Sequence, residues 1–428
     1  MKDSEISFIR SQFPALHNAS CVYLDNAGGS QVAQVVADRI HQYLLSTSVQ
    51  LGASYRTSVQ AQDRVLAARR AIADLVNAKD DREIVMGGST TGLMFLLIQA
   101  LRPSIRPGDE IILTNTDHEA NIGAWKRLEE VGAVIKIWEV NRQTMLLELE
   151  QLEPLLSPRT KWLAMTHASN ILGTINPVAE VAQRVHAVGG RVCVDGVAYA
   201  PHRLVDVQAS GADIYVFSFY KVFGPHYALM WGHLELLNSL ANLNHFFIPA
   251  DELPYKLQPG NVNFELSYGC AGIRDYLLAV ADFFQYDGTP RQRMQAVFKK
   301  FEDHENALAE QLLSYLRSKE KVSIIGLNTV TQGKQILTDG NMANDSNLTN
   351  LIQRVPTISF VHQELASPEI VRHIDQYGIG IRYGDFYAKH LISTLDLEKH
   401  GGVVRVSIAH YNTEQEIARL IRHLDEVL

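Results

Sequence analysis

The pattern of apolar and polar positions divides the chain into two parts. From Glu83 to Gly232, short apolar runs alternate with amphipathic or turn-bounded segments. Strands that are apolar on both faces suit a sheet covered by helices on each side, so this part predicts a mainly parallel sheet in a three-layer α/β domain. The expected strands are Glu83–Met86, Glu110–Asn115, Val134–Val140, Trp162–His167, Arg191–Asp195, Ile214–Phe219 and Tyr227–Trp231. The expected helices are Leu93–Leu101, Ile122–Val131, Met145–Leu156 and Val178–Val188.

The pattern changes after about Phe264. Two helical stretches, Ile273–Tyr286 and Arg291–Arg317, lead into a mixed region that predicts a smaller α+β domain. Its expected elements are the strands Val322–Ile325, Thr357–Val361, Gly378–Arg382 and Val403–Ile408, a hairpin or surface loop over Thr329–Ser346, and a closing helix over Thr413–Val427. We therefore expect a large α/β domain over residues 26–284 and a small domain built from residues 1–25 and 285–428.

Composition narrows the classes of function. The 428 residues are 46% hydrophobic and carry a formal net charge of −8, which argues against general affinity for nucleic acid or anionic membranes. Cys21, Cys193 and Cys270 are too few and too widely spaced for a disulfide framework or a metal knuckle. The first residues lack the pattern of a signal peptide, and no apolar run reaches the roughly 20 residues that span a bilayer. We expect a cytoplasmic protein.

Lys221 is the first candidate for chemistry. It follows the apolar run Ile214–Phe217 and precedes the Gly224-Pro225 break, an awkward place for a charge. A lysine held at the end of a buried strand is partly desolvated, which lowers its pKa and suits an imine-forming amine. Most lysines near strand ends have no such role, so the residues at the other strand ends decide between these interpretations.

Four other strand ends carry polar groups. Ser89 and Thr90 follow a strand and open a helix, where they either cap the helix or hold a phosphate. Asp195 either caps a turn or pairs with the nitrogen of a pyridine ring. His118 is either a satisfied loop residue or a ring that stacks on a cofactor, and Asn170 has an amide able to donate to a phenolate oxygen. In open α/β sheets ligands bind beyond the carboxyl ends of the strands, so together these residues predict a pyridoxal phosphate site.

The chain resembles the cysteine desulfurase branch of the class V aminotransferases, which are fold type I pyridoxal-phosphate enzymes. The matching motifs cover nearly the whole chain: Tyr23-Leu24-Asp25-Asn26-Ala27, Asp117-His118-Glu119-Ala120-Asn121, Thr166-His167-Ala168-Ser169-Asn170-Ile171-Leu172-Gly173-Thr174, Val194-Asp195-Gly196, Ser218-Phe219-Tyr220-Lys221 and Arg405-Val406-Ser407-Ile408-Ala409-His410-Tyr411-Asn412-Thr413. The resemblance implies a homodimer with a shared active site and a small amino-acid substrate.

The same resemblance implies roles for individual residues. Lys221 would be the Schiff-base lysine, and Asp195 would partner the pyridine nitrogen. The other implied cofactor contacts are His118 and Val197 on the two ring faces, Asn170 at the ring hydroxyl, Ser89, Thr90, Ser218 and Tyr220 at the phosphate, and Asn261 reaching the phosphate of the neighbouring subunit. Arg405 would bind the substrate α-carboxylate in a bidentate contact, with Arg382 and Arg56 as weaker candidates. Arg382 alternatively pairs with Asp385.

The chain departs from the family at the position of the desulfurase nucleophile. Tyr387 occupies the place of that cysteine. The segment around it, Gly384-Asp385-Phe386-Tyr387-Ala388, resembles that of a desulfurase-like subgroup of the family. Tyr387 is either a proton donor or a pocket wall. Ala198 and Tyr220 replace a glutamine and a histidine of the family near the cofactor. Sulfur transfer to a protein thiol is therefore less expected than release of sulfide, and any sulfur acceptor is left open.

These observations lead to one expected function and several alternatives. We expect a pyridoxal-phosphate enzyme with desulfurase-like or C–S lyase chemistry on a cysteine-like amino acid. Within the family the alternatives are an aminotransferase and an amino-acid epimerase. A cofactor-binding protein with negligible turnover is disfavoured, because Lys221, Asp195 and Arg405 are all present. A nicotinamide oxidoreductase is disfavoured because Ser89 stands at the middle glycine of the dinucleotide fingerprint.

Overall fold

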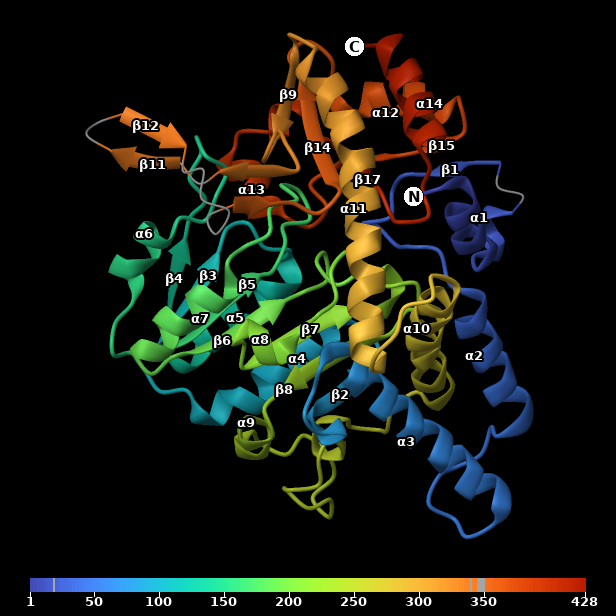
Figure 1. Cartoon of the computed structure of the whole chain (residues 1–428). Coiled ribbons are helices and arrows are strands. Elements are labelled where there is room, and N and C mark those ends of the chain that lie inside the picture. Colours follow the sequence, from blue (N-terminus) through green and yellow to red (C-terminus); the bar gives the residue numbers. More distant parts are fainter. Residues whose placement is uncertain (18–19, 334, 339–340, 345–350) are drawn as a thin grey trace.

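The computed structural model describes residues 1–17, 20–333, 335–338, 341–344 and 351–428 (Figure 1). Its central element is a seven-stranded sheet in the order β2-β8-β7-β6-β5-β3-β4. The strands are β2 Ile84–Gly87, β3 Glu110–Thr114, β4 Val134–Trp138, β5 Thr160–Thr166, β6 Arg191–Asp195, β7 Ile214–Ser218 and β8 Ala228–Gly232. Only β8 runs antiparallel to its neighbours β2 and β7. The expected mainly parallel sheet is confirmed, with each strand within two residues of its predicted bounds.

Alternating side chains of the strands build two apolar layers. On β6, Val192 and Val194 join one hydrophobic cluster, while Cys193 between them joins the other. The first layer is covered by α3, α7 and α10 and by the first half of α11 (Pro290–Arg317), and the second layer by α4, α5 and α9. The helices of this part are α2 Gln34–Ser46, α3 Arg56–Val76, α4 Thr90–Leu101, α5 Gly123–Lys126, α6 Leu149–Leu152, α7 Val178–Ala187, α8 Val207–Ser210, α9 Leu234–Ser239 and α10 Phe264–Phe283. Burial on both faces explains the continuous apolar runs in the sequence.

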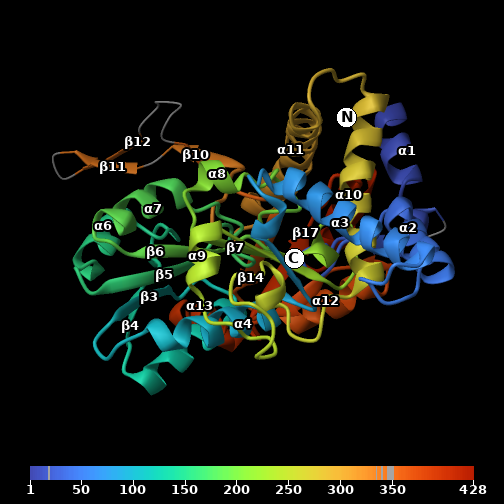
Figure 2. The same ribbon diagram turned by 90° about the horizontal axis from the view of Figure 1, so that it is seen from below.

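The helix α10 begins nine residues before the predicted start at Ile273. The predicted start was too late, and the added first part of α10 contains Gly269 and Gly272, which have low intrinsic helix propensity. In the structure α10 packs against α2, and a Cβ on Gly272 would lie 2.9 Å from the Cα of Val36. Both glycines therefore serve close helix packing, and Figure 2 shows α2, α3 and α10 gathered on one side of the molecule.

A second sheet lies above the first in Figure 1. Its four strands have the order β16-β17-β14-β9, all pairs antiparallel, with bounds β16 Arg382–Gly384, β17 Val403–Ser407, β14 Thr357–His362 and β9 Val322–Ile325. It packs with α12 Ser367–Asp375 and α14 Glu414–Asp425, and α13 Lys389–Thr394 follows β16. The predicted strand Gly378–Arg382 is divided, since β15 Ile379–Gly380 pairs with β1 Val22–Tyr23. The chain begins with α1 Asp3–Ser11.

The long helix α11, Pro290–Arg317, joins the two sheets. Its first half, with Met294 and Phe301, belongs to the core of the large sheet, and its second half, with Leu308 and Leu312, packs on the small sheet. The domain bounds 26–284, 1–25 and 285–428 stay a prediction. The expected hairpin or loop over Thr329–Ser346 contains β10 Thr331–Gly333, β11 Gln335–Thr338 and β12 Asn341–Asn344, with residues 334, 339–340 and 345–346 outside the described part. β10 pairs with β13 Leu351–Gln353.

None of the described helices combines the length and the apolar character needed to cross a membrane.

Candidate active site

A cavity lies at the carboxyl ends of the parallel strands, where the segments after β2, β3, β5, β6 and β7 meet. This is the position that an open α/β sheet offers to a ligand. Every predicted cofactor contact except Asn261 lines the cavity. The lining residues are Ser89, Thr90, Thr91, His118, Ala120, Thr166, Ala168, Asn170, Asp195, Val197, Ala198, Ser218, Tyr220 and Lys221.

One end of the cavity is suited to an anion. Ser89 caps α4, and its Oγ accepts a hydrogen bond from the backbone N–H of Gly92 at 3.0 Å. The hydroxyls of Thr90 and Ser218 lie 2.7 Å apart, which brings the start of α4 to the end of β7. The free N–H groups and the positive end of the helix dipole add to these hydroxyls. Ser89 is thus a helix cap that also faces the cavity, and a phosphate fits this end.

Lys221 enters the cavity from the turn that follows β7. Its side chain is buried, and burial, with the positive charge of Arg405, lowers its pKa from 10.5 to about 8, although Asp195 opposes the shift. No hydrogen-bond partner for its Nζ is found in the described part of the chain. The amine is therefore free to react, as an imine-forming lysine requires.

This lowered pKa predicts a pH dependence for cofactor capture. The neutral amine is the nucleophile, so the rate at which cofactor-free protein reacts with pyridoxal phosphate should rise with pH, reach half its maximum near pH 8 and level above about pH 9. Near pH 8, about 0.3% of an ordinary lysine is neutral, against about half of Lys221. Stopped-flow absorbance measures this rate, with Lys221→Ala as the blank. A rate that still climbs beyond pH 10 would mean that the pKa of Lys221 is not lowered.

Asp195 ends β6 beneath the cavity. Its Oδ1 accepts the backbone N–H of Val197 at 2.9 Å, and its backbone carbonyl accepts the N–H of His167 at 2.8 Å. Burial raises its pKa, and the charge of Lys221 opposes this shift. A Cβ on Gly196 would lie 2.2 Å from the ring of Tyr215, so the turn after Asp195 requires glycine there. Oδ1 of Asp195 therefore caps this turn. Its Oδ2 stays available for a group bound in the cavity, which Asp195 lines.

His118 presents a neutral ring to the cavity. Its Nδ1 accepts the backbone N–H of Ala120 at 3.1 Å, and burial, with the charges of Lys221 and Arg405, lowers its pKa to about 4. A neutral imidazole suits stacking on an aromatic cofactor. Sequence reasoning missed its neighbour Asp117, which is buried, accepts a 2.6 Å hydrogen bond from Asn121 and has its pKa raised to about 7 by burial. The sequence motif shows an acidic residue directly before His118, but it does not show that this residue is buried.

Arg405 lies on β17 of the small sheet, and its Nη1 donates to the backbone carbonyl of the cavity-lining residue Asn170 at 3.3 Å. It is 2% exposed, and its Nη2 donates to Asp25 at 3.1 Å. Burial lowers its pKa to about 10, against the effect of Asp25. Its Nε is buried with no hydrogen-bond partner in the described residues, which leaves a buried N–H donor without an acceptor. Arg382 lies directly across from Arg405 on β16 and pairs with Asp25 at 3.5 Å.

The alternative pairing of Arg382 with Asp385 was therefore wrong, because the strand register turns Arg382 toward Asp25. Asp25 itself was missed as a site residue. It stands in a quoted motif, but no local signal links it to an arginine 380 positions away.

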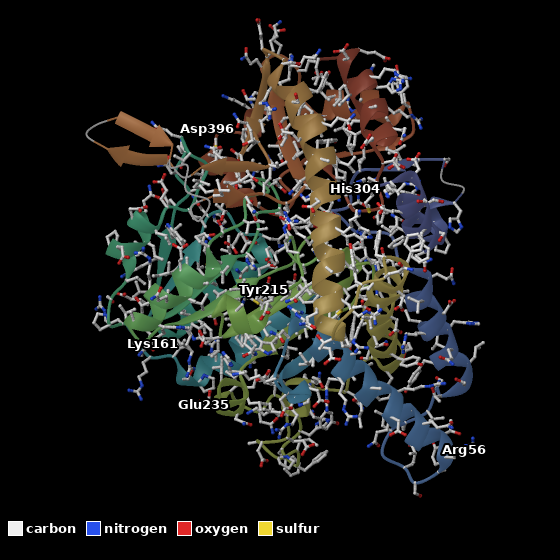
Figure 3. The ribbon with its side chains drawn as sticks, in the orientation of Figure 1. Arg56, Lys161, Tyr215, Glu235, His304 and Asp396 are labelled. Carbon is white, nitrogen blue, oxygen red and sulfur yellow. The ribbon has the colours of Figure 1, made fainter. Side chains whose placement is uncertain are left out.

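Five predicted site residues are not among those that line the cavity, namely Arg405, Arg382, Tyr387, Arg56 and Asn261. Arg56 begins α3 and is exposed, and Figure 3 shows it well away from Tyr215, which packs against Gly196. Asn261 is exposed in the segment before α10, with a φ of 80°. Neither residue lines the cavity of its own chain. The role of Asn261 at the phosphate of a neighbouring subunit and that of Arg56 as a weaker candidate for the substrate carboxylate stay predictions.

The loop that carries Tyr387 borders the cavity. The ring of Tyr387 lies 5.2 Å from the ring of His118 and is 70% exposed, and its carbonyl accepts the N–H of Glu119 at 2.7 Å. None of the three cysteines lines the cavity. Burial raises the pKa of the Cys193 and Cys270 thiols well above the usual value.

The residues present fit pyridoxal phosphate. The start of α4 offers an anion site, His118 and Val197 offer walls for a flat ring, Asp195 offers an acid for a ring nitrogen, and Lys221 offers an amine for an aldehyde. Arg405, which donates to the backbone carbonyl of the lining residue Asn170, has a buried Nε without a hydrogen-bond partner among the described residues.

Comparisons with known proteins agree with this geometry. Residues 22–245 and 344–420 match the family described as Aminotransferase class-V. The chain is 40% identical over 433 residues to the aminotransferase-like protein FGM3 of Gibberella zeae, covering 99% of this chain and 98% of that protein. It is 31% identical to the cysteine desulfurase-like protein ustD of Aspergillus flavus, covering 99% and 91%. The structure of the cysteine desulfurase CsdA of Escherichia coli matches with a TM-score of 0.79 at 26% identity, covering 98% of each chain.

Proposed function

Because the chain belongs to the class V aminotransferase family and is a pyridoxal-phosphate enzyme of the desulfurase-like kind, we propose that it eliminates a leaving group from Cβ of a cysteine-like amino acid. The products of such a reaction on cysteine are sulfide, pyruvate and ammonia. The reaction differs from that of a desulfurase, which leaves alanine and passes sulfur to a thiol.

One observation carries this proposal. Tyr387 stands beside His118 at the mouth of the cavity, and no thiol lines the cavity in the described part of the chain. A reaction that needs a protein persulfide lacks its nucleophile, whereas elimination needs only a base at Cα and an exit for the leaving group. The loss of sulfur as free sulfide follows from this difference.

Arg405, Asp195 and Lys221 have separate roles in the proposed elimination. Arg405, with its free Nε–H, binds and orients the substrate α-carboxylate. The bound cofactor supplies an electron sink for the electrons released at Cα. Asp195 keeps the ring nitrogen protonated through its free Oδ2, and its burial excludes water from that contact. Lys221 holds the cofactor before the substrate binds and then takes the α-proton on Nζ, for which a pKa of about 8 is well matched to neutral pH.

The products distinguish elimination from sulfur transfer. Purified wild-type enzyme with L-cysteine should release sulfide and pyruvate in equal amounts, with little alanine. Cys21→Ser should change neither, because Cys21 is the one cysteine that is not fully buried and it lies outside the cavity. Alanine in place of pyruvate would refute elimination. Turnover of other amino acids without any sulfide would direct attention to an aminotransferase or an epimerase.

We also propose that two copies form a homodimer in which each completes the other's site. Arg56 and Asn261 are exposed and lie outside the cavity of their own chain, as residues that serve a neighbour would. Light scattering that reports a monomer at assay concentration would contradict this arrangement.

A further inference from the structure

Three contacts close a ring between Arg405, Asn170 and Phe386. Arg405 Nη1 donates to the backbone carbonyl of Asn170 at 3.3 Å. Asn170 Nδ2 donates to the backbone carbonyl of Phe386 at 3.0 Å. The guanidinium carbon of Arg405 lies 3.7 Å from the centre of the Phe386 ring. We propose that Phe386 is a positioning residue that holds Arg405 in place for the substrate α-carboxylate.

The aromatic contact acts on a desolvated cation. Phe386 is 8% exposed and Arg405 is 2% exposed, so water does not compete for the guanidinium face. A cation over an aromatic face is attracted by the ring quadrupole, and the attraction is largest when both partners are dry. Since the ring covers a face of the guanidinium, it restrains the plane in which the N–H donors lie. With Nη1 on Asn170 and Nη2 on Asp25, the unpaired Nε–H is held in a defined direction.

The backbone of the loop is shaped for this contact. Phe386 and Tyr387 have φ values of 51° and 60°, a region that bulky residues rarely occupy. Such a conformation persists only when its surroundings determine it. Here the Tyr387 N–H donates to Asp385 Oδ1 at 3.0 Å and the Tyr387 carbonyl accepts from Glu119 at 2.7 Å, in addition to the Asn170 contact. The loop therefore presents the Phe386 ring to Arg405 and its carbonyl to Asn170 at the same time.

This ring of contacts connects the two halves of the site. Arg405 belongs to β17 of the small sheet, and Asn170 follows β5 of the large sheet and lines the cofactor cavity. The inference rests on the proposed role of Arg405 as the carboxylate-binding residue and extends it. Phe386 keeps the carboxylate-binding arginine at a fixed place relative to the cofactor wall, which a tyrosine at the same position would also do.

The test measures binding of a probe that has no α-proton. Holoenzyme is titrated by calorimetry with α-aminoisobutyrate and with its carboxamide, which lacks the negative charge. The wild-type enzyme should bind α-aminoisobutyrate, the acid, more tightly than its carboxamide. Phe386→Leu should weaken binding of the acid by about tenfold, as expected for loss of a desolvated cation–π contact. Phe386→Leu should leave the affinity for the carboxamide unchanged. Phe386→Tyr should bind α-aminoisobutyrate as tightly as the wild type does. The matched control Phe283→Leu removes a ring on α10 that stacks on Phe8, outside the cavity.

Each outcome has a separate meaning. Equal weakening of acid and carboxamide in Phe386→Leu would show general damage to the site and overturn the inference. An unchanged preference for the acid in Phe386→Leu would overturn it while the role of Arg405 stands. No preference for the acid in wild type would refute carboxylate recognition by Arg405, and with it both the proposed role and the inference. The inference is supported if Phe386→Leu weakens binding of α-aminoisobutyrate but not of the carboxamide, and if Phe386→Tyr binds both as the wild type does.

Discussion

Replacement of Lys221 by alanine should reduce turnover of any amino-acid substrate by at least about a thousandfold, because a positioned general base contributes roughly 10²- to 10⁴-fold and the same side chain also holds the cofactor. The structure gives this lysine a buried position and a pKa of about 8, so it is a competent base at neutral pH. The measurement is steady-state release of sulfide and pyruvate, with the visible absorbance of the bound cofactor followed in parallel.

A second variant separates charge from basicity at this position. Lys221→Arg keeps a positive charge, but a guanidinium does not lose its proton at accessible pH and forms no imine. It should therefore be as inactive as Lys221→Ala. Added methylamine should restore part of the rate to Lys221→Ala, because it supplies the missing amine to the space left in the cavity. If either variant kept more than a tenth of the wild-type rate, Lys221 would not be the base.

Asp195→Asn should lower kcat by about 10²- to 10³-fold, the usual effect of removing one preorganised electrostatic contact in a site without water. The amide keeps the shape of the side chain and is able to accept from the Val197 N–H, so the fold is preserved. What is lost is the negative charge that keeps the ring nitrogen protonated. The value of kcat at saturating substrate and cofactor measures the effect.

Asp117 offers a matched control for this change. It is another fully buried carboxyl group at the end of a parallel strand, and burial raises its pKa to about 7, so its neutral form is already populated at neutral pH. Its partners, Thr114 and Asn121, are uncharged. Asp117→Asn should lower kcat by less than about tenfold. Equal losses in the two variants would assign the effect of Asp195→Asn to burial of an amide rather than to loss of charge.

Much of the fold follows from local patterns in the sequence. The strands of the large sheet were recognisable because burial on both faces makes them continuously apolar, as in β7 with Ile214–Ser218. The cofactor residues could be grouped because parallel strands end at one edge, so Ser89, His118, Asn170, Asp195 and Lys221 had to lie near one another.

Other features were not visible in the sequence because they depend on partners far along the chain. The early start of α10 depends on its fit against α2, where Gly272 allows close contact with Val36. The pairing of Asp25 with both Arg405 and Arg382 depends on the register of β16 against β17. In each case the local residues allow several structures, and a contact between distant segments selects one.

The sequence by itself determined the layered α/β fold, the family and the set of residues at the strand ends, because these follow from periodicity and from motifs that are local in the chain. Only the tertiary structure decided which of these groups are buried, charged and paired. The lowered pKa of Lys221 was expected from its place after an apolar strand, but the burial that raises the pKa of Asp195 and of Asp117 was not, nor was the ring that the loop at Phe386 brings to Arg405. The extent of desolvation and the contacts between distant segments are properties of the packed molecule.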